Sequence, residues 1–322
     1  MLATAGQLPA DARGWVTETK LDGCRSMARV YGEGAQLFSR PGNQLSARFP
    51  EVTAALATAL DGRAAILDGE IVTPDPRTGA PCFQLLQRRL AVPSPRRMLQ
   101  ASIPATLCVF DILNLDGADL TQLPYLQRRA ILEELPLRKT KAIAVPPVWP
   151  DLAADVFLDV MRDLSLEGVV MKRADSTYQP GRRSKSWVKS VLRRRAAVLL
   201  CGWTFRGAAE SVGSLVVGAH NASGALVYCG VVSSGLSRKA RTTLHARLSE
   251  IEVAHPPFTD MPPSAAVRWV HPRLVAMIEY REFNGRFRHP AFKGLLSADP
   301  TIVPLPALDK TPRQAASRAT RG

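Results

Sequence analysis

Hydrophobic and polar residues alternate in the first part of the chain, after a short polar lead-in over residues 1–14. The alternation predicts strands over 15–19, 24–31 and 36–40. Asp22 and Gly23 lie between the first two strands and are typical turn residues. Lys20 is therefore expected at the edge of a strand–turn–strand unit. Taken alone, this pattern is that of a surface hairpin carrying a solvated lysine.

The next 150 residues mix helical and strand patterns. Apolar residues at helical spacing predict helices over 52–60, 125–135 and 152–164, and a basic helix or helix pair over 83–97. Buried strands are predicted over 64–72, where an acidic turn interrupts the strand, over 106–113 and over 167–173. A basic segment with a central Trp187 follows over 184–191, and we expect this tryptophan to pack between domains.

The pattern changes near residue 192, where short strands over 197–203, 214–219, 225–232 and 275–283 surround one helix over 238–251. Several short strands with one helix favour a small OB-fold β-barrel. The sequence therefore predicts an α+β protein with a first domain of antiparallel sheets and helices over 1–192. The OB-fold domain is expected over 193–304, and a disordered basic tail over 305–322.

Composition adds a charge argument. The 322 residues include 42 Lys and Arg against 28 Asp and Glu, a net charge of +14. Such an excess favours a polyanionic partner, although a GC-rich coding bias toward Arg and Ala explains it about equally well. Five scattered cysteines without a Cys-x-x-Cys pair argue against disulfides and zinc. Neither a signal peptide nor a membrane-spanning run is evident, so we expect a cytoplasmic, nucleoid-associated protein.

Charged or aromatic residues recur at predicted strand ends, where sites are commonly built. A nucleoside triphosphate needs cations for its phosphates, a slot for its base, and carboxylates for ribose and metal. Lys20 could then attack the α-phosphorus. The candidates are Arg25, Arg40, Lys172 and Lys189 for the phosphates, Phe110 for the base, and Glu70 and Glu167 for ribose and metal. Singly, Phe110 suits a core position and the carboxylates suit ordinary turns.

Five ordered stretches, beginning with Lys20-Leu21-Asp22-Gly23-Cys24-Arg25 and including Glu167-Gly168-Val169-Val170-Met171-Lys172, resemble the motifs of the covalent nucleotidyltransferase superfamily. Within it the chain resembles ATP-dependent DNA ligases of the bacterial type, related to the ligase module of non-homologous end-joining ligases. The resemblance implies that Lys20 becomes adenylylated. It further implies these roles: adenine contact by Glu18, adenine stacking by Phe110, ATP contacts by Arg25 and Arg40, ribose and metal contacts by Glu70, metal binding by Glu167, and phosphate contacts by Arg183 and Lys189.

The chain departs from the family pattern at two places. Val191 occupies the position where these ligases often have a second lysine, and only Arg193, Arg194 or Arg195 could replace it. The stretch 292–300, Phe-Lys-Gly-Leu-Leu-Ser-Ala-Asp-Pro, lacks the usual Arg-x-Asp-Lys that orients pyrophosphate in the family. Lys293, Arg286 and Arg288 are the candidates to compensate.

The resemblance implies ATP and Mg²⁺ or Mn²⁺ as cofactors and nicked double-stranded DNA as substrate, with AMP passing from the lysine to the 5′-phosphate of the nick. We expect a monomer that acts in DNA repair or recombination, possible partners being a Ku-like end-binding protein and separate polymerase or nuclease chains. Two alternatives stay open: an RNA ligase or capping-type nucleotidyltransferase, and a ligase-like nucleic-acid-binding protein with impaired self-adenylylation.

Overall fold

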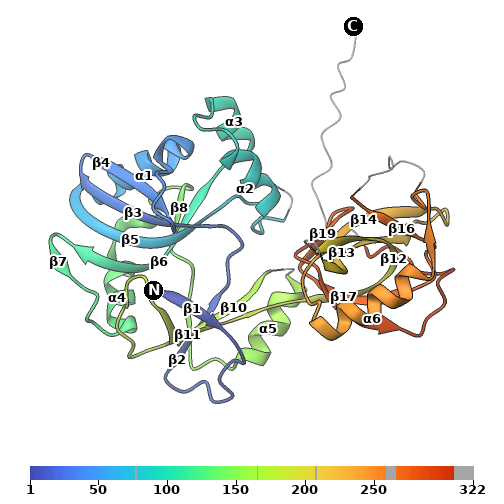
Figure 1. Cartoon of the computed structure of the whole chain (residues 1–322). Coiled ribbons are helices and arrows are strands. Elements are labelled where there is room, and N and C mark those ends of the chain that lie inside the picture. The colour runs from blue at the N-terminus through green and yellow to red at the C-terminus, as the bar shows by residue number, and fades with distance from the viewer. Residues whose placement is uncertain (77, 165, 207–208, 259–265, 308–322) are drawn as a thin grey trace, which may run out of the picture. The chain divides into compact units, whose positions relative to one another are not determined.

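The computed structural model describes residues 1–76, 78–164, 166–206, 209–258 and 266–307 (Figure 1). The chain divides into two compact units, Met1–Leu192 and Arg193–Gly322. Each unit has its own apolar core, and each is described here by itself. Among the described residues, no helix is long and apolar enough to cross a membrane. The disordered tail expected over 305–322 lies outside the described residues from 308 onward.

The first unit contains two sheets. The strands of the six-stranded sheet are β3 (Cys24–Gly32), β4 (Gly34–Ser39), β5 (Gly62–Val72), β6 (Thr106–Leu115), β7 (Ala118–Asp119) and β8 (Ile143–Ala144). The strands of the five-stranded sheet are β1 (Leu2–Ala5), β2 (Trp15–Thr19), β9 (Trp149–Pro150), β10 (Gly168–Arg173) and β11 (Arg183–Val191). The helices are η1 (Ser46–Arg48), α1 (Pro50–Leu60), α2 (Phe83–Leu90), α3 (Arg97–Ser102), α4 (Tyr125–Glu134), η2 (Pro136–Lys139) and α5 (Ala154–Asp163).

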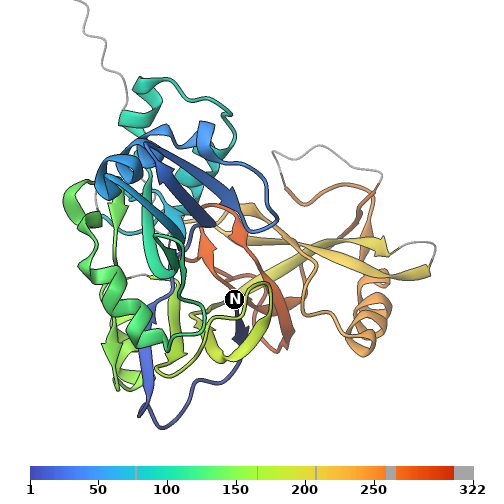
Figure 2. The ribbon, with the colours of Figure 1, turned by 90° about the vertical axis from the view of Figure 1, so that its left-hand side faces the viewer.

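The six-stranded sheet (Figure 2) is ordered β4-β3-β5-β6-β7, and β8 pairs with β6 beside that path. One face of the sheet forms the main core of the first unit. Helix α1 covers it because Val52, Leu56, Ala59 and Leu60 recur on one helical face and are buried. Proline at the first helical position favours the start of α1, and a left-handed Asp61 ends it. The opposite face carries polar side chains together with a smaller apolar cluster that includes Met27 and Ile66.

The predicted acidic interruption of the strand over 64–72 is wrong, because β5 runs without a break through that region. Gly69 is needed for packing: a Cβ there would lie 2.7 Å from the Cys108 carbonyl oxygen on β6. The polar lead-in is also more ordered than its composition suggests, since β1 pairs in parallel with β11. The helix pair predicted over 83–97 corresponds to α2 and α3.

Residues 20–23 join the two sheets. Strand β2 pairs with β10 and β9, whereas β3 pairs with β4 and β5 in the other sheet. The expected hairpin at Lys20 is therefore a crossover between sheets. Gly23 permits it, because a Cβ there would lie 2.3 Å from the Ile71 carbonyl oxygen. This crossover holds Lys20 where two sheet faces meet.

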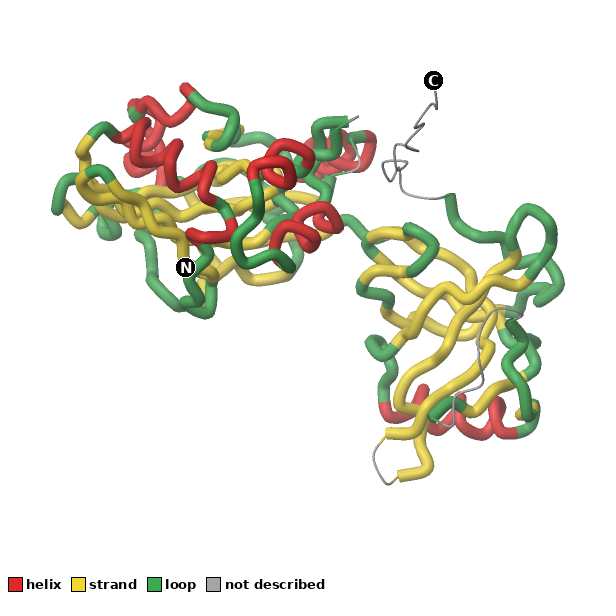
Figure 3. The backbone as a smooth tube through the Cα atoms, turned by 90° about the horizontal axis from the view of Figure 1, so that it is seen from above, coloured by secondary structure: helices red, strands yellow, loops and turns green. Residues whose placement is uncertain are grey.

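The second unit is OB-fold-like and built mainly from strands (Figure 3). Its elements are β12 (Arg194–Arg206), β13 (Ala209–His220), β14 (Leu226–Val232), α6 (Arg238–Ser249), β15 (Glu252–Val253), β16 (Arg268–Val270), β17 (Val275–Tyr280), β18 (Glu282–Phe283), β19 (Phe287–Arg288) and β20 (Ala291–Leu296). The ladder β14-β13-β12-β17-β20 stays open, and one bridge between Ser234 and Ala291 brings its two edges together. Helix α6 starts at Ser237, whose side chain accepts from the Ala240 N–H.

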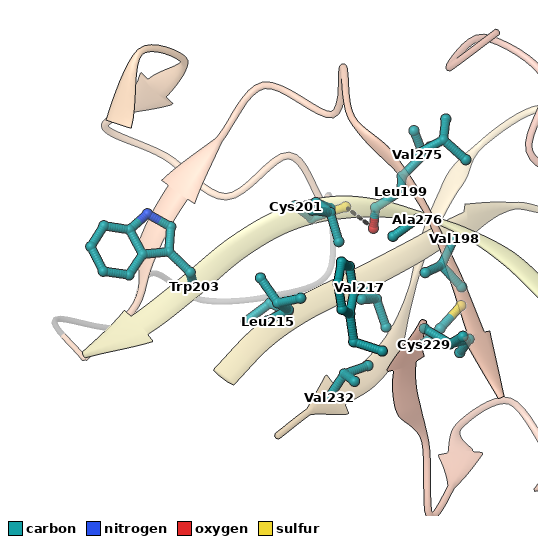
Figure 4. Packing of buried hydrophobic residues seen from close by; sticks show 14 of the residues in the cluster. Val198, Leu199, Cys201, Trp203, Leu215, Val217, Cys229, Val232, Val275 and Ala276 are labelled. Atoms are coloured by element: carbon teal, nitrogen blue, oxygen red, sulfur yellow. Dashed lines mark hydrogen bonds between the residues drawn. The ribbon is translucent and has the colours of Figure 1, made fainter. Parts of the chain in front are cut away.

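The interior of the second unit is apolar. Figure 4 shows Val198 and Cys201 from β12 with Leu215 and Val217 from β13, all fully buried in one cluster. The cluster extends to Val232 at the end of β14, and α6 adds Leu244 and Leu248. Residues 198–201 of β12 and 215–217 of β13 are buried without alternation, so both faces of these two strands contribute to the cluster.

Candidate active site

Strand alternation places several predicted site residues on the polar face of the six-stranded sheet. On β5, Leu67 and Ile71 enter the apolar core, so Asp68 and Glu70 point to the opposite face. Arg25 on β3 pairs with Glu70 in the strand register. A β-bulge adds Phe110, because Asp68 pairs with Asp111 whereas the next residue, Gly69, pairs with Val109. Bulges re-aim side chains in this way beside functional sites.

The five-stranded sheet supplies the predicted site residues on the other side of the site. Val170 on β10 pairs with Glu18 on β2 and with Lys189 on β11. Lys172, two residues along β10, pairs with Trp187 on β11 and lies on the same face. The other face of this sheet packs against α5 through Phe157, Met161 and Val169. Two sheet faces, joined at Lys20, therefore carry the predicted residues.

A cavity of about 410 Å³ lies between these faces. Its lining contains nine predicted site residues: Glu18, Lys20, Arg25, Arg40, Glu70, Phe110, Lys172, Arg183 and Lys189. Val170 and Trp187 also line it. The tenth predicted residue, Glu167, reaches the site through its ion pair with Lys20. A space of this volume is in the range of small-molecule sites.

Lys20 is held at both ends. Its backbone N–H donates to the Gly168 carbonyl oxygen at 2.8 Å, and its Nζ lies 2.6 Å from Glu167 Oε2. Gly168 has a φ of +144°, and a Cβ there would lie 2.2 Å from the Ser190 carbonyl oxygen. Glycine beside Glu167 is therefore required for β10 to approach β11. Among the described residues, the ionic partner of Lys20 is therefore the Glu167 carboxylate.

Arg25 is bound by a carboxylate on the neighbouring strand. Its guanidinium donates to both oxygens of Asp68, at 3.0 and 2.6 Å, in a fork that fixes its plane. The Tyr178 hydroxyl donates to Asp68 Oδ2 at 2.7 Å. The Arg25 guanidinium also lies 5.5 Å from the centre of the Phe110 ring. Arg25 thus enters the cavity in one fixed orientation.

Lys172 has surroundings different from those expected of a phosphate ligand. Its side chain is 2 % exposed, and its Nζ lies 2.7 Å from Glu18 Oε1. The rings of Phe110, Tyr125 and Trp187 surround the ammonium, with centroids 4.3 to 4.6 Å away. Burial lowers the pKa of Lys172, and the Glu18 carboxylate opposes that effect. Trp187 packs inside the first unit, so its expected position between domains is wrong.

A further buried ion pair was missed by sequence reasoning. Asp111 accepts two hydrogen bonds from Arg128, at 2.8 and 2.9 Å, and both side chains have no exposure. Arg128 also donates to the carbonyl oxygens of Leu123 and Ser176. Burial raises the pKa of Asp111, and the Arg128 hydrogen bonds counteract it. We call Glu18, Arg25, Asp68, Asp111, Arg128 and Lys172 the buried ion layer.

The family comparison agrees with this geometry. The model of the "ATP dependent DNA ligase domain" matches residues 5–190, and that of the "ATP dependent DNA ligase C terminal region" matches residues 208–297. The chain belongs to the ATP-dependent DNA ligase family. The two matched regions of this ligase fall in the first and second units respectively.

Individual relatives of the ligase are end-joining proteins. It is 34% identical over 303 residues to the multifunctional non-homologous end joining protein LigD of Mycolicibacterium smegmatis, and this match covers 92% of the chain but 38% of the relative. The chain therefore spans about two fifths of the length of that relative. The ligase domain of M. tuberculosis LigD is 32% identical, with a TM-score of 0.54 over 94% of this chain and 96% of that domain. A mycobacterial DNA ligase D solved with ATP and MES is 33% identical, with the same TM-score and coverage.

The Glu70 carboxyl at the cavity of the ligase has a raised pKa. Burial raises its pKa to about 8, Lys20 and Arg25 oppose the shift, and the Glu167 carboxylate adds to it. Below that pH the folded protein keeps Glu70 largely protonated. A cation bound between Glu70 and Glu167 would remove the repulsion that helps to raise this pKa.

The basic residues proposed to replace the missing C-terminal motif are held within the second unit. Lys293 Nζ lies 2.7 Å from Glu279 Oε2, and Arg195 pairs with the same carboxylate at 2.9 Å. Arg286 lies 4.3 Å over the Tyr228 ring and donates to the Tyr228 carbonyl oxygen. Arg288 lies 3.4 Å from Glu282. Lys293, Arg286 and Arg288 would therefore each have to give up a present contact in order to bind a phosphate.

Proposed function

We propose that this chain seals nicks in double-stranded DNA through a lysyl-AMP intermediate. The observation that carries the proposal is Lys20 at the crossover of two sheets, beside Glu167 and within a cavity lined by cations and an aromatic ring. A single reactive lysine among phosphate-binding cations suits nucleotidyl transfer better than hydrolysis, because the amine is itself the nucleophile.

In the first step, Lys20 Nζ attacks the α-phosphorus of ATP. An N–P bond forms, the bond to the bridging oxygen breaks, and pyrophosphate leaves. The amine gives up a proton, and Glu167 Oε2, 2.6 Å from Nζ, is an acceptor within reach. Arg40, Arg183 and Lys189 would neutralise phosphate charge from the cavity wall.

In the second step, an oxygen of the 5′-phosphate at the nick attacks the AMP phosphorus. The N–P bond breaks and Lys20 regains its proton. In the third step, the 3′-hydroxyl attacks the activated 5′-phosphate, a phosphodiester bond forms, and AMP leaves. All three steps are phosphoryl transfers, so positioning and charge neutralisation supply most of the catalysis.

Mg²⁺ or Mn²⁺ fits the donors at the cavity. The described residues contain no group of three or more Asp, Glu, His and Cys able to hold a metal by themselves. Glu70 and Glu167, two carboxylates close enough to repel, would share the cation with phosphate oxygens, as Mg²⁺ prefers. When bound, the cation supplies charge neutralisation at the phosphates.

A basic surface segment supports duplex DNA as the substrate. No Asp or Glu occurs from residue 76 to residue 110. Within that segment, Arg88 on α2, Arg97 on α3 and Arg96 just before α3 are exposed. Arginines without acidic neighbours suit a phosphate backbone, and binding of this kind weakens as salt rises.

The similarity to LigD proteins supports a role in non-homologous end-joining repair on chromosomal DNA. On this proposal the chain works as a monomer, a Ku-like end-binding protein recruits it, and separate chains supply polymerase and nuclease activities. Binding to DNA ends with and without such a protein, followed in an assay of blunt-end joining, tests the recruitment.

Intact-mass measurement with ATP tests the lysyl-AMP intermediate. The wild-type chain is expected to gain one AMP, which added pyrophosphate removes, whereas Lys20→Ala gains none. Lys185→Ala, which removes an exposed lysine from β11, is the matched control and should still be labelled. Labelling of Lys20→Ala would refute the assignment of the nucleophile.

Sealing assays then separate the rival functions. Nicked DNA and ATP are the expected pair. Preference for nicked RNA, or labelling by GTP, would favour an RNA ligase or a capping-type enzyme. A wild-type chain that binds nicked duplex but never gains AMP would favour the nucleic-acid-binding alternative.

A further inference from the structure

Lys172 and Tyr125 bind the same oxygen of Glu18. Lys172 Nζ lies 2.7 Å from Glu18 Oε1, and the Tyr125 hydroxyl donates to that atom too. Tyr125 lies at the first turn of α4 and is fully buried, whereas Lys172 comes from β10. Two elements far apart in the sequence therefore converge on one carboxylate at the cavity wall.

The cage around Lys172 makes this arrangement rigid. Phe110, Tyr125 and Trp187 present their rings to the ammonium at 4.3 to 4.6 Å, which stabilises a cation removed from water. Edge-on contacts between Trp187 and both Phe110 and Tyr178 lock the aromatic rings together. Lys172 consequently has little freedom to leave Glu18 and reach into the cavity.

Glu18 is left with one oxygen for a ligand. Both polar side-chain contacts that the described residues make with it fall on Oε1, and the residue lines the cavity with 7 % exposure. A carboxylate oxygen only accepts hydrogen bonds while it is ionised. Its ligand must therefore present a donor, and a carbonyl oxygen at that place would be repelled.

We propose that Lys172 and Tyr125 are positioning residues that fix Glu18 as the acceptor for the exocyclic 6-amino group of adenine, and so set the preference for ATP over GTP. This inference rests on the proposed function, because it assumes that the base enters the cavity next to Phe110. Guanine carries an oxygen at the corresponding position, which the Glu18 carboxylate would repel.

Positioning of Glu18 by Lys172 differs from the phosphate contact that the sequence predicted for Lys172. A phosphate ligand should affect ATP and GTP equally, because the two nucleotides have the same triphosphate. A residue that positions the base acceptor should change their ratio. It should also act mainly on KM, since base contacts are made in the ground state as well as in the transition state.

The test compares Tyr125→Phe and Lys172→Met with wild type for covalent labelling by ATP and by GTP. Tyr125→Phe is expected to lower the ATP-to-GTP ratio of kcat/KM by about tenfold, the equivalent of one hydrogen bond, mainly through a higher KM for ATP. Lys172→Met should lower it further, because it leaves Glu18 buried without its cation. Tyr125→Phe retains the ring of the cage and keeps the test valid if Lys172→Met fails to fold.

Tyr178→Phe is the matched control, since it removes an equally buried hydroxyl whose partner is Asp68 rather than Glu18. Its ATP-to-GTP ratio should stay at the wild-type value. An unchanged ratio in folded Tyr125→Phe and Lys172→Met would overturn the inference.

Calorimetric binding of ATP and GTP to the Lys20→Ala variant separates this inference from the proposed function. That variant cannot form the adduct, so the binding ratio reports base selection alone. Loss of ATP preference when Tyr125→Phe is added supports the positioning role even if the wild-type chain never gains AMP. Equal ratios with and without Tyr125→Phe contradict it.

Discussion

The two units of this ligase bury different kinds of side chains. In the described residues, every buried charged side chain lies in the first unit: Glu18, Asp68, Asp75, Arg89, Asp111, Arg128, Arg129 and Lys172. The core of the second unit is a single apolar cluster filled by aliphatic and aromatic residues and two cysteines. Both units are built on antiparallel strands, so strand architecture alone does not explain the difference.

The difference reflects what each interior has to hold. Buried ion pairs add little net stability compared with apolar packing, because desolvation cancels most of the attraction. They do fix charged groups in place, and three members of the buried ion layer, Glu18, Arg25 and Lys172, line the cavity. The interior of the second unit is apolar, so its contribution to stability comes mainly from burial of hydrophobic area. Buried charge here therefore marks the unit that has to organise a charged ligand.

The largest effect is expected from removing one member of the buried ion pair between Asp111 on β6 and Arg128 on α4. Asp111→Ala leaves Arg128 without its carboxylate in an interior with no exposure, and should lower the free energy of unfolding by about 3–5 kcal/mol. Asp175→Ala is the control, because both side chains of its pair with Arg173 are about half exposed or more. The control should lose about 1 kcal/mol or less.

Urea unfolding followed by circular dichroism measures both variants. Similar losses for Asp111→Ala and Asp175→Ala would mean that the buried pair has no special energetic role. In that event the contrast between the two interiors would be one of composition rather than of energetics.

The ion layer also shows where sequence reasoning stops. Lys20, Glu70, Phe110 and Glu167 could be named from motifs, because their spacing along the chain is itself the signal. Arg128 could not, since an arginine on an amphipathic helix is normally a solvated residue, and only the tertiary fold brings Asp111 to it. The available hint was Asp111 itself, a carboxylate inside an otherwise apolar strand.

Topology was similarly out of reach for the segment around Lys20. Alternation correctly gave the strands on both sides of Asp22 and Gly23, but local pattern cannot tell a hairpin from a crossover between sheets. That choice depends on pairing with β10 and β5, which lie far along the chain. In the second unit, the apolar strands and the position of α6 were predictable because hydrophobic burial acts residue by residue.

The second prediction compares a buried and an exposed apolar residue of the second unit. Leu215→Ala on β13 should lower the free energy of unfolding by about 3 kcal/mol, within the usual range for a buried leucine, because it leaves a cavity in a fully buried cluster. Ile302→Ala, at a side chain that is 75 % exposed, should change it by less than about 0.5 kcal/mol. Thermal unfolding at low and high salt measures both.

The loss caused by Leu215→Ala should be the same at both salt concentrations, because apolar packing involves no charge. A loss that varies with salt would mean that electrostatic terms contribute to the second interior as well. The proposed division between the two units would then be wrong.

The smallest expected effect concerns pH and Glu70. Since burial raises the pKa of Glu70 to about 8, the unfolded chain releases this proton near pH 4.5 whereas the folded chain keeps it until about pH 8. The wild-type protein should therefore lose stability relative to Glu70→Gln as the pH rises between these values. The difference should level off above about pH 8, at about 1–3 kcal/mol after allowance for partial exposure.

Glu33→Gln, on the exposed turn between β3 and β4, controls for the loss of one negative charge and should give a difference that hardly varies with pH. Urea unfolding at half-unit pH steps, without nucleotide or metal, gives the two curves. If Glu70→Gln followed the control, the Glu70 carboxylate would already be ionised at neutral pH in the free protein. If Glu70→Gln gives the predicted curve, a cation that binds to Glu70 below pH 8 must displace a proton. Calorimetry in buffers of different ionisation enthalpy would detect the release of that proton directly.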